Sequence, residues 1–234
     1  MKINNEITVI ISAYNEEKNL EQAAKDVISA LKNEILKFEI IIIDDGSTDD
    51  TAKIAAGLAQ KYRNIRVIRN AQNLGLGRSF ARAVAQIKTP YLTVFPGDND
   101  MAASSLVPLI KKRHEADLIT AYMENDKSRS IGRKAISKFY VSFMNRLFGF
   151  KLRYYNGPFV AKTSSIQSLT LRSCGLDIYA ETKVRMIKKG YSYKEIPFTH
   201  TGRQHGKSKA LTFKNIARTT RSIFSLYCEL RHKC

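Results

Sequence analysis

Two carboxylates standing two residues apart, Asp98 and Asp100, are the clearest candidate for chemistry in this sequence of 234 residues. They close the run 95–100, which reads FPGDND and continues a short apolar stretch typical of a strand. Side chains at positions i and i+2 beyond a strand can face one cleft and share a hard divalent cation. Mg²⁺ and Mn²⁺ bind oxygen ligands and often complete their shells with substrate phosphates. The pair therefore predicts a cation site that neutralises a diphosphate leaving group, the alternative being an acidic surface turn.

A second acidic run, DDGS at 44–47, directly follows the most apolar stretch of the chain, residues 39–43. At the end of a strand, the carboxylate of Asp45 can accept hydrogen bonds from a ribose or a base, and Gly46 lets the chain turn sharply. Taken alone, such a run is more often an ordinary turn that leads into a helix cap. It indicates a nucleotide contact only in combination with other motifs.

The elements that would position these carboxylates alternate between strands and helices. Short runs rich in β-branched residues predict strands, and apolar residues at helical spacing predict helices. The predicted strands are 7–12, 39–43, 65–69, 91–95 and 117–122, and the predicted helices are 17–36, 51–62, 75–87 and 104–114. This order predicts an α/β fold, a doubly wound and mostly parallel sheet with helices on both faces. We expect its ligand beyond the carboxyl ends of the strands.

The net charge of +18 lies entirely in the second half of the chain. Residues 1–100 hold 13 basic and 13 acidic residues, whereas residues 101–234 hold 26 and 8. The basic half also contains two amphipathic segments, 133–150 and 211–230. Each segment alone is typical of a helix packed on a sheet, but with the charge they indicate a surface for phosphates or for acidic lipid. We expect no nucleic-acid partner, because the acidic runs would repel a phosphate backbone and no nucleic-acid motif is present.

Two further features bear on the compartment. The three cysteines lack metal-ligand spacing and cannot all pair, which favours a reducing cytoplasm over an oxidising one. The apolar runs are far shorter than the roughly 20 residues needed to cross a bilayer, and the first residues do not form a signal peptide. We therefore expect a chain without a membrane-spanning segment.

Taken together, the motifs of the first half resemble glycosyltransferase family 2, whose GT-A fold uses nucleotide-sugar donors. The motifs are YNEE at 14–17, DDGSTD at 44–49, NLGLG at 73–77 and the pair Asp98 and Asp100. The resemblance implies that Asp98 and Asp100 are catalytic and bind the metal. It also implies a set of residues that bind the nucleotide sugar: Ala13, Tyr14, Glu16, Ile43, Asp45, Asn73, Asp98 and Asn99.

Motifs of the second half resemble the dolichol-phosphate mannosyltransferase-like branch of that family, which passes a sugar to a polyprenyl phosphate. They are GY followed by EIP at 190–197, and RxxGxSK at 203–209. The resemblance implies that Arg203 and Lys209, and also Arg133, contact donor or acceptor phosphates. Because a phosphate monoester is already ionised near neutral pH, it needs no strong base, whereas a hydroxyl acceptor does. Asp177 and Glu181 are the candidate bases, and Glu181 matches a glutamate of the family.

Three positions depart from the family's pattern. Ser12 stands where a proline is usual, Ala102 where a glutamine follows the metal motif, and Tyr122 where an arginine is common. The departures concern the metal ligands and the donor more than the fold.

The sequence as a whole predicts a metal-dependent inverting glycosyltransferase that transfers a sugar from a GDP- or UDP-sugar to a polyprenyl phosphate. Residues 1–122 form its nucleotide-sugar-binding half, 123–210 its acceptor half and 211–234 a basic amphipathic C-terminal helix. We expect peripheral attachment to the cytoplasmic face of an anionic membrane, with a membrane-protein partner or a homo-oligomer as other occupants of the basic surface. The alternatives are a family 2 enzyme with a glycan or other hydroxyl acceptor and, more distantly, a basic nucleic-acid-binding module.

Overall fold

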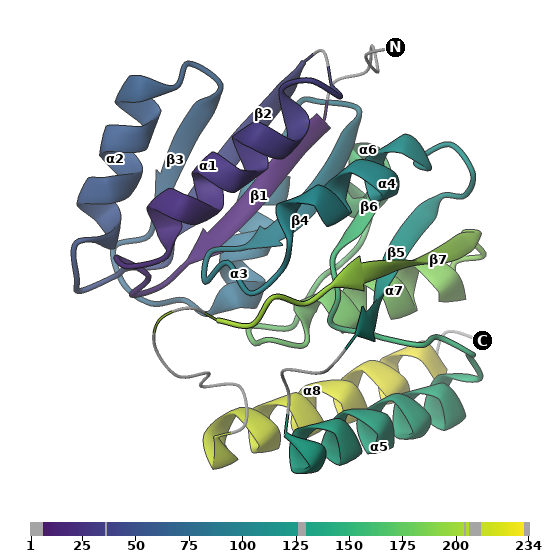
Figure 1. Cartoon of the computed structure of the whole chain (residues 1–234). Helices are drawn as coiled ribbons and strands as arrows, with labels where there is room; N and C mark the ends of the chain where they lie inside the picture. Colours follow the sequence, from purple (N-terminus) through teal and green to yellow (C-terminus); the bar gives the residue numbers. More distant parts are fainter. Residues whose placement is uncertain (1–6, 36, 126–129, 204, 206–211, 232–234) are drawn as a thin grey trace.

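One seven-stranded sheet runs through the described part of the chain, which comprises residues 7–35, 37–125, 130–203, 205 and 212–231 of the computed structural model. The strands are β1 (Ile7–Ala13), β2 (Phe38–Asp44), β3 (Ile65–Arg69), β4 (Tyr91–Pro96), β5 (Leu118–Asn125), β6 (Phe159–Lys162) and β7 (Tyr193–Thr199). Their order is β3-β2-β1-β4-β6-β5-β7 (Figure 1). Strands β1 to β4 are parallel, β6 is antiparallel to β4 and β5, and β7 is parallel to β5. The predicted doubly wound, mostly parallel sheet is confirmed.

Helices cover both faces of this sheet. They are α1 (Leu20–Leu31), α2 (Thr51–Lys61), α3 (Leu76–Val84), α4 (Leu106–Lys111), α5 (Ile131–Phe148), α6 (Thr163–Gln167), α7 (Ile178–Lys188) and α8 (Phe213–Arg231), with a 3₁₀ turn at Ala103–Ser105. Because successive strand residues point to opposite faces, Val9 and Ile11 pack with α1, α2 and α4, whereas Ile10 packs with α3, α6 and α7. Both faces of β1 and β2 are thus buried, which explains their uninterrupted apolar sequence.

Helices α5 and α8 lie side by side outside the sheet and pack against α7 (Figure 1). Their shared core contains Met144 and Phe148 of α5, Val184 of α7, and Ile223 and Leu226 of α8. Helices therefore occupy most of the two segments 133–150 and 211–230, and they rest on a helix rather than directly on the sheet. No helix in the described ranges is both long enough and apolar enough to span a bilayer.

Some boundaries differ from the sequence prediction. The predicted helix 17–36 begins only at Leu20, because the backbone at Glu16 and Glu17 is tied to the loop after β2. The predicted helix 104–114 is shorter and is divided between the 3₁₀ turn and α4. Strands β6 and β7 and helix α6 were not predicted. β6 is short, and β7 carries polar residues and a proline that mask its pattern.

Candidate active site

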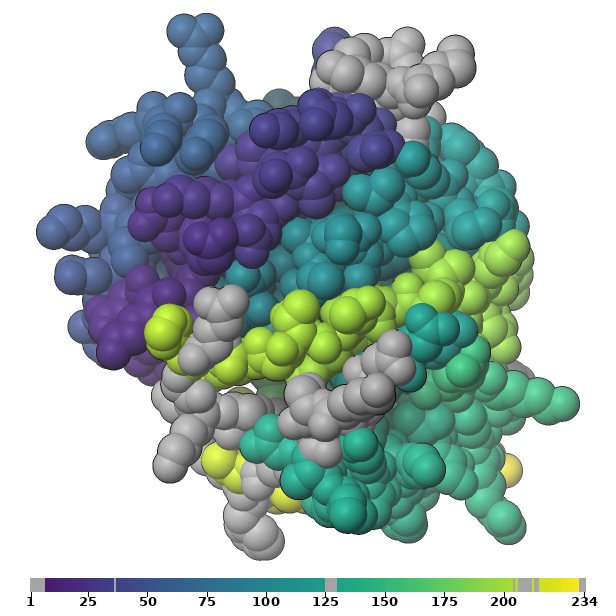
Figure 2. Space-filling model, viewed as in Figure 1, coloured from purple at the N-terminus to yellow at the C-terminus, as the bar shows by residue number. Residues whose placement is uncertain are grey.

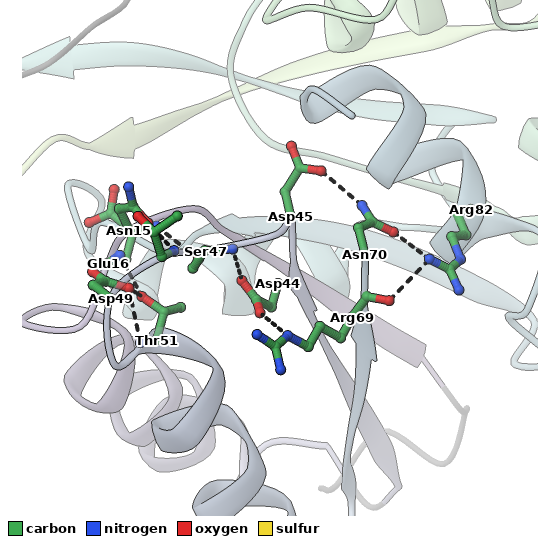
Figure 3. Close-up of polar contacts among 11 residues, drawn as sticks. Asn15, Glu16, Asp44, Asp45, Ser47, Asp49, Thr51, Arg69, Asn70 and Arg82 are labelled. Carbon is green, nitrogen blue, oxygen red and sulfur yellow. Dashed lines mark hydrogen bonds and ion pairs between the residues drawn. The ribbon is translucent and has the colours of Figure 1, made fainter. Parts of the chain in front are cut away.

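The loops after β1 and β2 are locked together at the carboxyl edge of the sheet (Figure 3). The backbone N–H of Asn15 donates to Ser47 Oγ at 3.0 Å, and the N–H of Glu16 donates to Thr51 Oγ1 at 2.8 Å. In return, Asn15 Oδ1 accepts the N–H of Thr48 at 2.9 Å. Asn15 has φ 56°, a left-handed conformation that asparagine adopts more readily than most residues. The predicted contact residue Tyr14 is partly exposed beside this junction, with 38% of its surface accessible.

Asp45 organises a third loop, between β3 and α3. One carboxylate oxygen accepts hydrogen bonds from Asn70 Nδ2, the N–H of Leu74 and Ser79 Oγ, at 2.8, 2.9 and 2.8 Å. The other accepts the N–H of Gly75 at 2.9 Å. Asp45 is 6% exposed, so its visible role is to hold the loop that carries the predicted nucleotide contact Asn73.

Three predicted contact residues flank these loops. Asn73 itself is exposed and lies against the turn at Gly46, which has φ 71° and no room for a side chain, since a Cβ there would come within 2.7 Å of the Asn73 nitrogen. Ala13 is the last residue of β1 and Ile43 the last but one of β2, and both side chains are buried. The Ala13 carbonyl already accepts the N–H of Asp45 at 2.9 Å.

The predicted metal pair follows β4 on a strained turn. Asn99 between the two aspartates has φ 55°, and its amide donates to Asp26 of α1 at 2.8 Å, so its side chain anchors the turn. Asp98 Oδ1 is buried without a hydrogen-bond partner, and Asp98 Oδ2 lies 3.4 Å from Arg203 Nη2. Strained backbone of this kind persists where the surrounding structure holds it, often at functional sites.

The segment after β7 closes onto this turn and brings Arg203 into the site. Residue 200 bridges Met101, and the N–H of Thr201 donates to the Asp100 carbonyl at 3.0 Å. His200 Nε2 lies 3.6 Å from Asp100 Oδ2, and the Arg203 guanidinium bridges Glu16 and Asp98. Figure 2 shows β7 and its continuation crossing the molecule between the purple-to-teal half and α5. Sequence reasoning did not single out His200. Its position three residues before Arg203 was the available signal.

The electrostatics of the turn fit a hard divalent cation. Burial, together with the negative charges of Asp100 and Glu16, raises the pKa of Asp98 to about 6, and the positive charge of Arg203 opposes this shift. A partly buried carboxylate with an unpartnered oxygen beside a second carboxylate is a donor set that Mg²⁺ and Mn²⁺ accept. No group of three His, Cys, Asp or Glu side chains among the described residues has metal-binding geometry. Substrate phosphates or water would therefore supply the other ligands.

Glu181, the candidate base, has other partners in the structure. Its carboxylate is 4% exposed and accepts the N–H groups of Arg172 and Ser173 and the Nε–H of Arg185, at distances between 2.7 and 3.1 Å. Asp177 at the start of α7 is 2% exposed, and its Oδ1 has no hydrogen-bond partner. Of these two carboxylates, only Asp177 retains a free acceptor atom.

Two of the three predicted basic residues lie in the part of the chain that the structure describes, and one of these two contacts the carboxylates. Arg203 is in the site, as described above. Arg133 lies exposed in the first turn of α5, and Lys209 lies outside the described residues.

Comparison with known proteins identifies the family. Residues 8–171 match the model of glycosyl transferase family 2, so the chain belongs to that family, and the predicted enzyme class, a glycosyltransferase, is confirmed at this level. The chain is 30% identical over 230 residues to the dolichol-phosphate mannosyltransferase of Pyrococcus furiosus, covering 94% of this chain and 63% of that protein. It is 26% identical over 209 residues to the undecaprenyl-phosphate 4-deoxy-4-formamido-L-arabinose transferase of Edwardsiella ictaluri, covering 87% and 62%. The chain thus spans less than two thirds of these relatives.

Solved structures share the fold. Glucosyl-3-phosphoglycerate synthase from Mycobacterium tuberculosis, in complex with Mn²⁺, UDP and phosphoglyceric acid, has a TM-score of 0.72 at 18% identity and covers 97% of this chain and 78% of that one. The same enzyme with Mg²⁺ and UDP has a TM-score of 0.69 at 16% identity, covering 97% and 79%. These likenesses confirm the predicted GT-A fold class.

Proposed function

We propose that this chain transfers a sugar from a nucleotide-diphosphate sugar to a polyprenyl phosphate, with inversion and with a divalent cation. The observation that carries the proposal is a group of three carboxylates at the carboxyl edge of the sheet, in which Glu16 and Asp98 pair with Arg203 and Asp100 lies beside Asp98. This edge is where ligands bind in doubly wound folds. The cation, when bound to Asp98 and Asp100, supplies positive charge against the diphosphate leaving group.

The donor would bind along the loops after β1, β2 and β3. We assign the nucleoside to Tyr14, Glu16 and Asn73, with the backbone at Ala13 and Ile43 closing the floor. Asp45 and Asn99 would act by holding the two loops in place, since their side chains are already hydrogen-bonded. Arg203 would contact the diphosphate, because its Nη2 atom lies 3.4 Å from Oδ2 of the proposed metal ligand Asp98.

A phosphate acceptor suits the site better than a hydroxyl acceptor. A hydroxyl needs a carboxylate to remove its proton. The carboxylate of Glu181 is saturated with hydrogen bonds, which leaves the free oxygen of Asp177 as the only buried candidate of the two. An ionised phosphate needs neither group. The relatives in Pyrococcus furiosus and Edwardsiella ictaluri are named for dolichol-phosphate and undecaprenyl-phosphate chemistry, which supports the same choice.

We assign the acceptor phosphate to a basic cavity along α5. The cavity has a volume of about 360 Å³ and is lined by Ser137, Lys138, Val141, Ser142, Asn145 and Arg153. The Arg153 guanidinium lies 3.4 Å from the centre of the Tyr122 ring, where relatives commonly carry an arginine. Tyr122 of β5 pairs with Pro197 of β7, which lies three residues before His200 at the metal turn. Tyr122 and the metal turn are therefore roughly 10 Å apart along β7. Arg133 and Lys209 would add phosphate contacts in this acceptor half.

The surface of α5 and α8 is suited to an anionic membrane. Phe139 is 74% exposed, Phe143 is 45% exposed and stacks on it, and Phe224 of α8 is 66% exposed. Exposed Arg146, Arg218 and Arg221 accompany these rings. Basic residues near acidic lipid contribute about 1 kcal/mol each, and apolar faces add burial at the headgroups. We propose peripheral attachment through this surface on the cytoplasmic face.

Ligand binding tests the proposed donor site. UDP and GDP are titrated into the chain with and without Mn²⁺ by isothermal titration calorimetry, with wild type compared with Asp100→Asn. We expect metal-dependent binding of one of the two nucleotides to wild type and its loss in the variant. Equal binding of both proteins without metal would contradict the proposal.

Vesicle co-sedimentation tests the membrane surface. We expect binding to vesicles with acidic lipid, weaker binding in 1 M salt because the Debye length falls to about 3 Å, and a clear loss in the Phe139→Ser/Phe143→Ser variant. Tyr193→Ser, which removes an exposed ring on β7, is the control and should bind as wild type. If acidic lipid makes no difference, the surface is an oligomer or protein contact instead.

A further inference from the structure

A chain of buried ion pairs connects α8 to the body of the protein. Arg185 of α7 donates through Nη1 and Nη2 to both carboxylate oxygens of Glu229 on α8, at 3.1 and 2.8 Å. Its Nε–H donates to Glu181 at 2.7 Å, and Arg172 Nε lies 3.4 Å from Glu229. The side chains of Arg185, Glu181 and Glu229 are only 7%, 4% and 13% exposed. A bidentate arginine fixes geometry as well as charge.

Glu181 passes this constraint to the loop before α7. Its carboxylate accepts the backbone N–H groups of Arg172, at 3.0 Å, and Ser173, at 2.7 Å. Ser173 Oγ in turn accepts the N–H of Gly175 at 3.1 Å. The path of the backbone at 172–175 is therefore set by one carboxylate, whose own position is set by Arg185.

The backbone of the loop at 172–175 is in direct contact with the start of α3. The N–H of Gly77 donates to the Cys174 carbonyl at 3.2 Å. A Cβ on Gly77 would lie 1.9 Å from the Ser173 carbonyl oxygen, and one on Gly75 would lie 2.2 Å from that of Cys174. These are contacts between backbone atoms, with no flexible side chain between them to absorb a shift. Gly75 is also the residue whose N–H is bound by Asp45.

We propose that Arg185 and Glu229 are positioning residues for the donor site, so that the docking of α8 sets the geometry of the loop at 73–77 that receives the nucleotide. This inference rests on the proposed function. The path runs from Glu229 through Arg185 and Glu181 to the backbone at 172–174 and then to Gly75 and Gly77. Loss of the Glu229 carboxylate would remove the partner of Arg185 Nη1 and Nη2 and the ion pair with Arg172, leaving Arg185 held only through Glu181 among the described residues.

The test compares Glu229→Gln with wild type in the full chain. We expect Mn²⁺-dependent binding of UDP or GDP to weaken by about fivefold or more, with the donor KM raised and kcat little changed. Glu115→Gln makes the same substitution in an exposed ion pair, between Glu115 and Lys194. It is the matched control and should bind nucleotide as wild type does. If Glu229→Gln does not fold, Arg185→Lys keeps the charge but cannot make the bidentate contact and is measured in the same way.

Amide hydrogen exchange separates this inference from the proposed function. Without any ligand, the amides of Leu74, Gly75 and Gly77 should exchange faster in Glu229→Gln than in wild type and than in Glu115→Gln. If Glu229→Gln shows wild-type exchange at these amides, or a lower melting temperature with unchanged nucleotide affinity, the inference is overturned. The ion pairs would then only attach α8 to α7, without an effect on the donor site. Failure of wild type to bind either nucleotide would instead contradict the proposed function, while the exchange result still decides the coupling.

Discussion

Replacing Asp98 by asparagine should stabilise the metal-free protein at neutral pH while removing its cation site. Burial of Asp98 and the neighbouring charge of Asp100 raise its pKa from 3.8 to about 6 in the folded state. A carboxyl whose folded pKa is raised stabilises the fold at low pH, and this contribution is lost as the pH rises through about 6. Asparagine is neutral at every pH, so Asp98→Asn should avoid the cost of the buried charge.

The size of the effect follows from the shift. The raised pKa of about 6 already includes the opposing charge of Arg203, and the rise of about two pKa units corresponds to about 3 kcal/mol at pH 8. We therefore expect Asp98→Asn to be up to about 3 kcal/mol more stable than wild type at pH 8. The difference between the two proteins should shrink toward zero or reverse near pH 4, where the wild-type carboxyl is protonated in the folded state and about half protonated in the unfolded state.

The assay is urea unfolding followed by far-UV circular dichroism at pH 4, 6 and 8, since the chain has no tryptophan. Saturating Mn²⁺ should stabilise wild type and leave the variant unchanged, because ligand binding to the folded state adds to its stability. Asp117→Asn is a control of opposite sign. Hydrogen bonds from Ser192 lower the pKa of Asp117, so its removal should destabilise the protein more as the pH rises. A difference between Asp98→Asn and wild type that is independent of pH would refute the electrostatic account of the site.

Three other substitutions test separate parts of the structure. Arg203→Gln should raise the pKa of Asp98 further, because Arg203 opposes that shift, and should weaken nucleoside-diphosphate binding by roughly tenfold or more in calorimetry. Asp45→Ala leaves buried donors of its loop unsatisfied and should cost about 3–5 kcal/mol in urea unfolding, with nucleotide binding lost as well. Burial lowers the pKa of Lys183, which is fully buried on α7, to about 7. Its contribution to the free energy of unfolding therefore grows as the pH rises from 7 toward 10.5. Lys183→Met should accordingly stabilise the protein at pH 6 and much less at pH 9, and equal stabilisation at both would contradict this.

The motifs predicted what is local in the chain. Asp98 and Asp100 could be placed at the end of a strand, because the apolar run before them and the order of elements specify that edge of the sheet. The contact between Glu16 and Arg203 joins residues 187 positions apart, and no periodicity reveals it. Only the return of β7 to the metal turn brings the two together.

Glu181 and Lys183 show a different limit of sequence reasoning. A glutamate at the start of a helix looks equally suitable as a base or as a cap, and the sequence does not reveal that Glu181 accepts hydrogen bonds from Arg185 on α7 and from the loop at 172–173. Lys183 reads as a solvated helix residue, yet its ammonium is buried and donates to the Gly157 carbonyl at 2.9 Å. Such burial depends on how α7 packs against elements distant in sequence.

The most direct measurement of the central claim is sugar transfer to two matched acceptors. The purified chain is incubated with a panel of UDP- and GDP-sugars, Mn²⁺, and either a short polyprenyl phosphate or the corresponding polyprenol, and products are identified by mass spectrometry. The account predicts a glycosyl phosphodiester formed from the phosphate acceptor only, dependent on the metal and absent with Asp100→Asn. Equal transfer to the free alcohol, or full activity of Asp100→Asn, would contradict it.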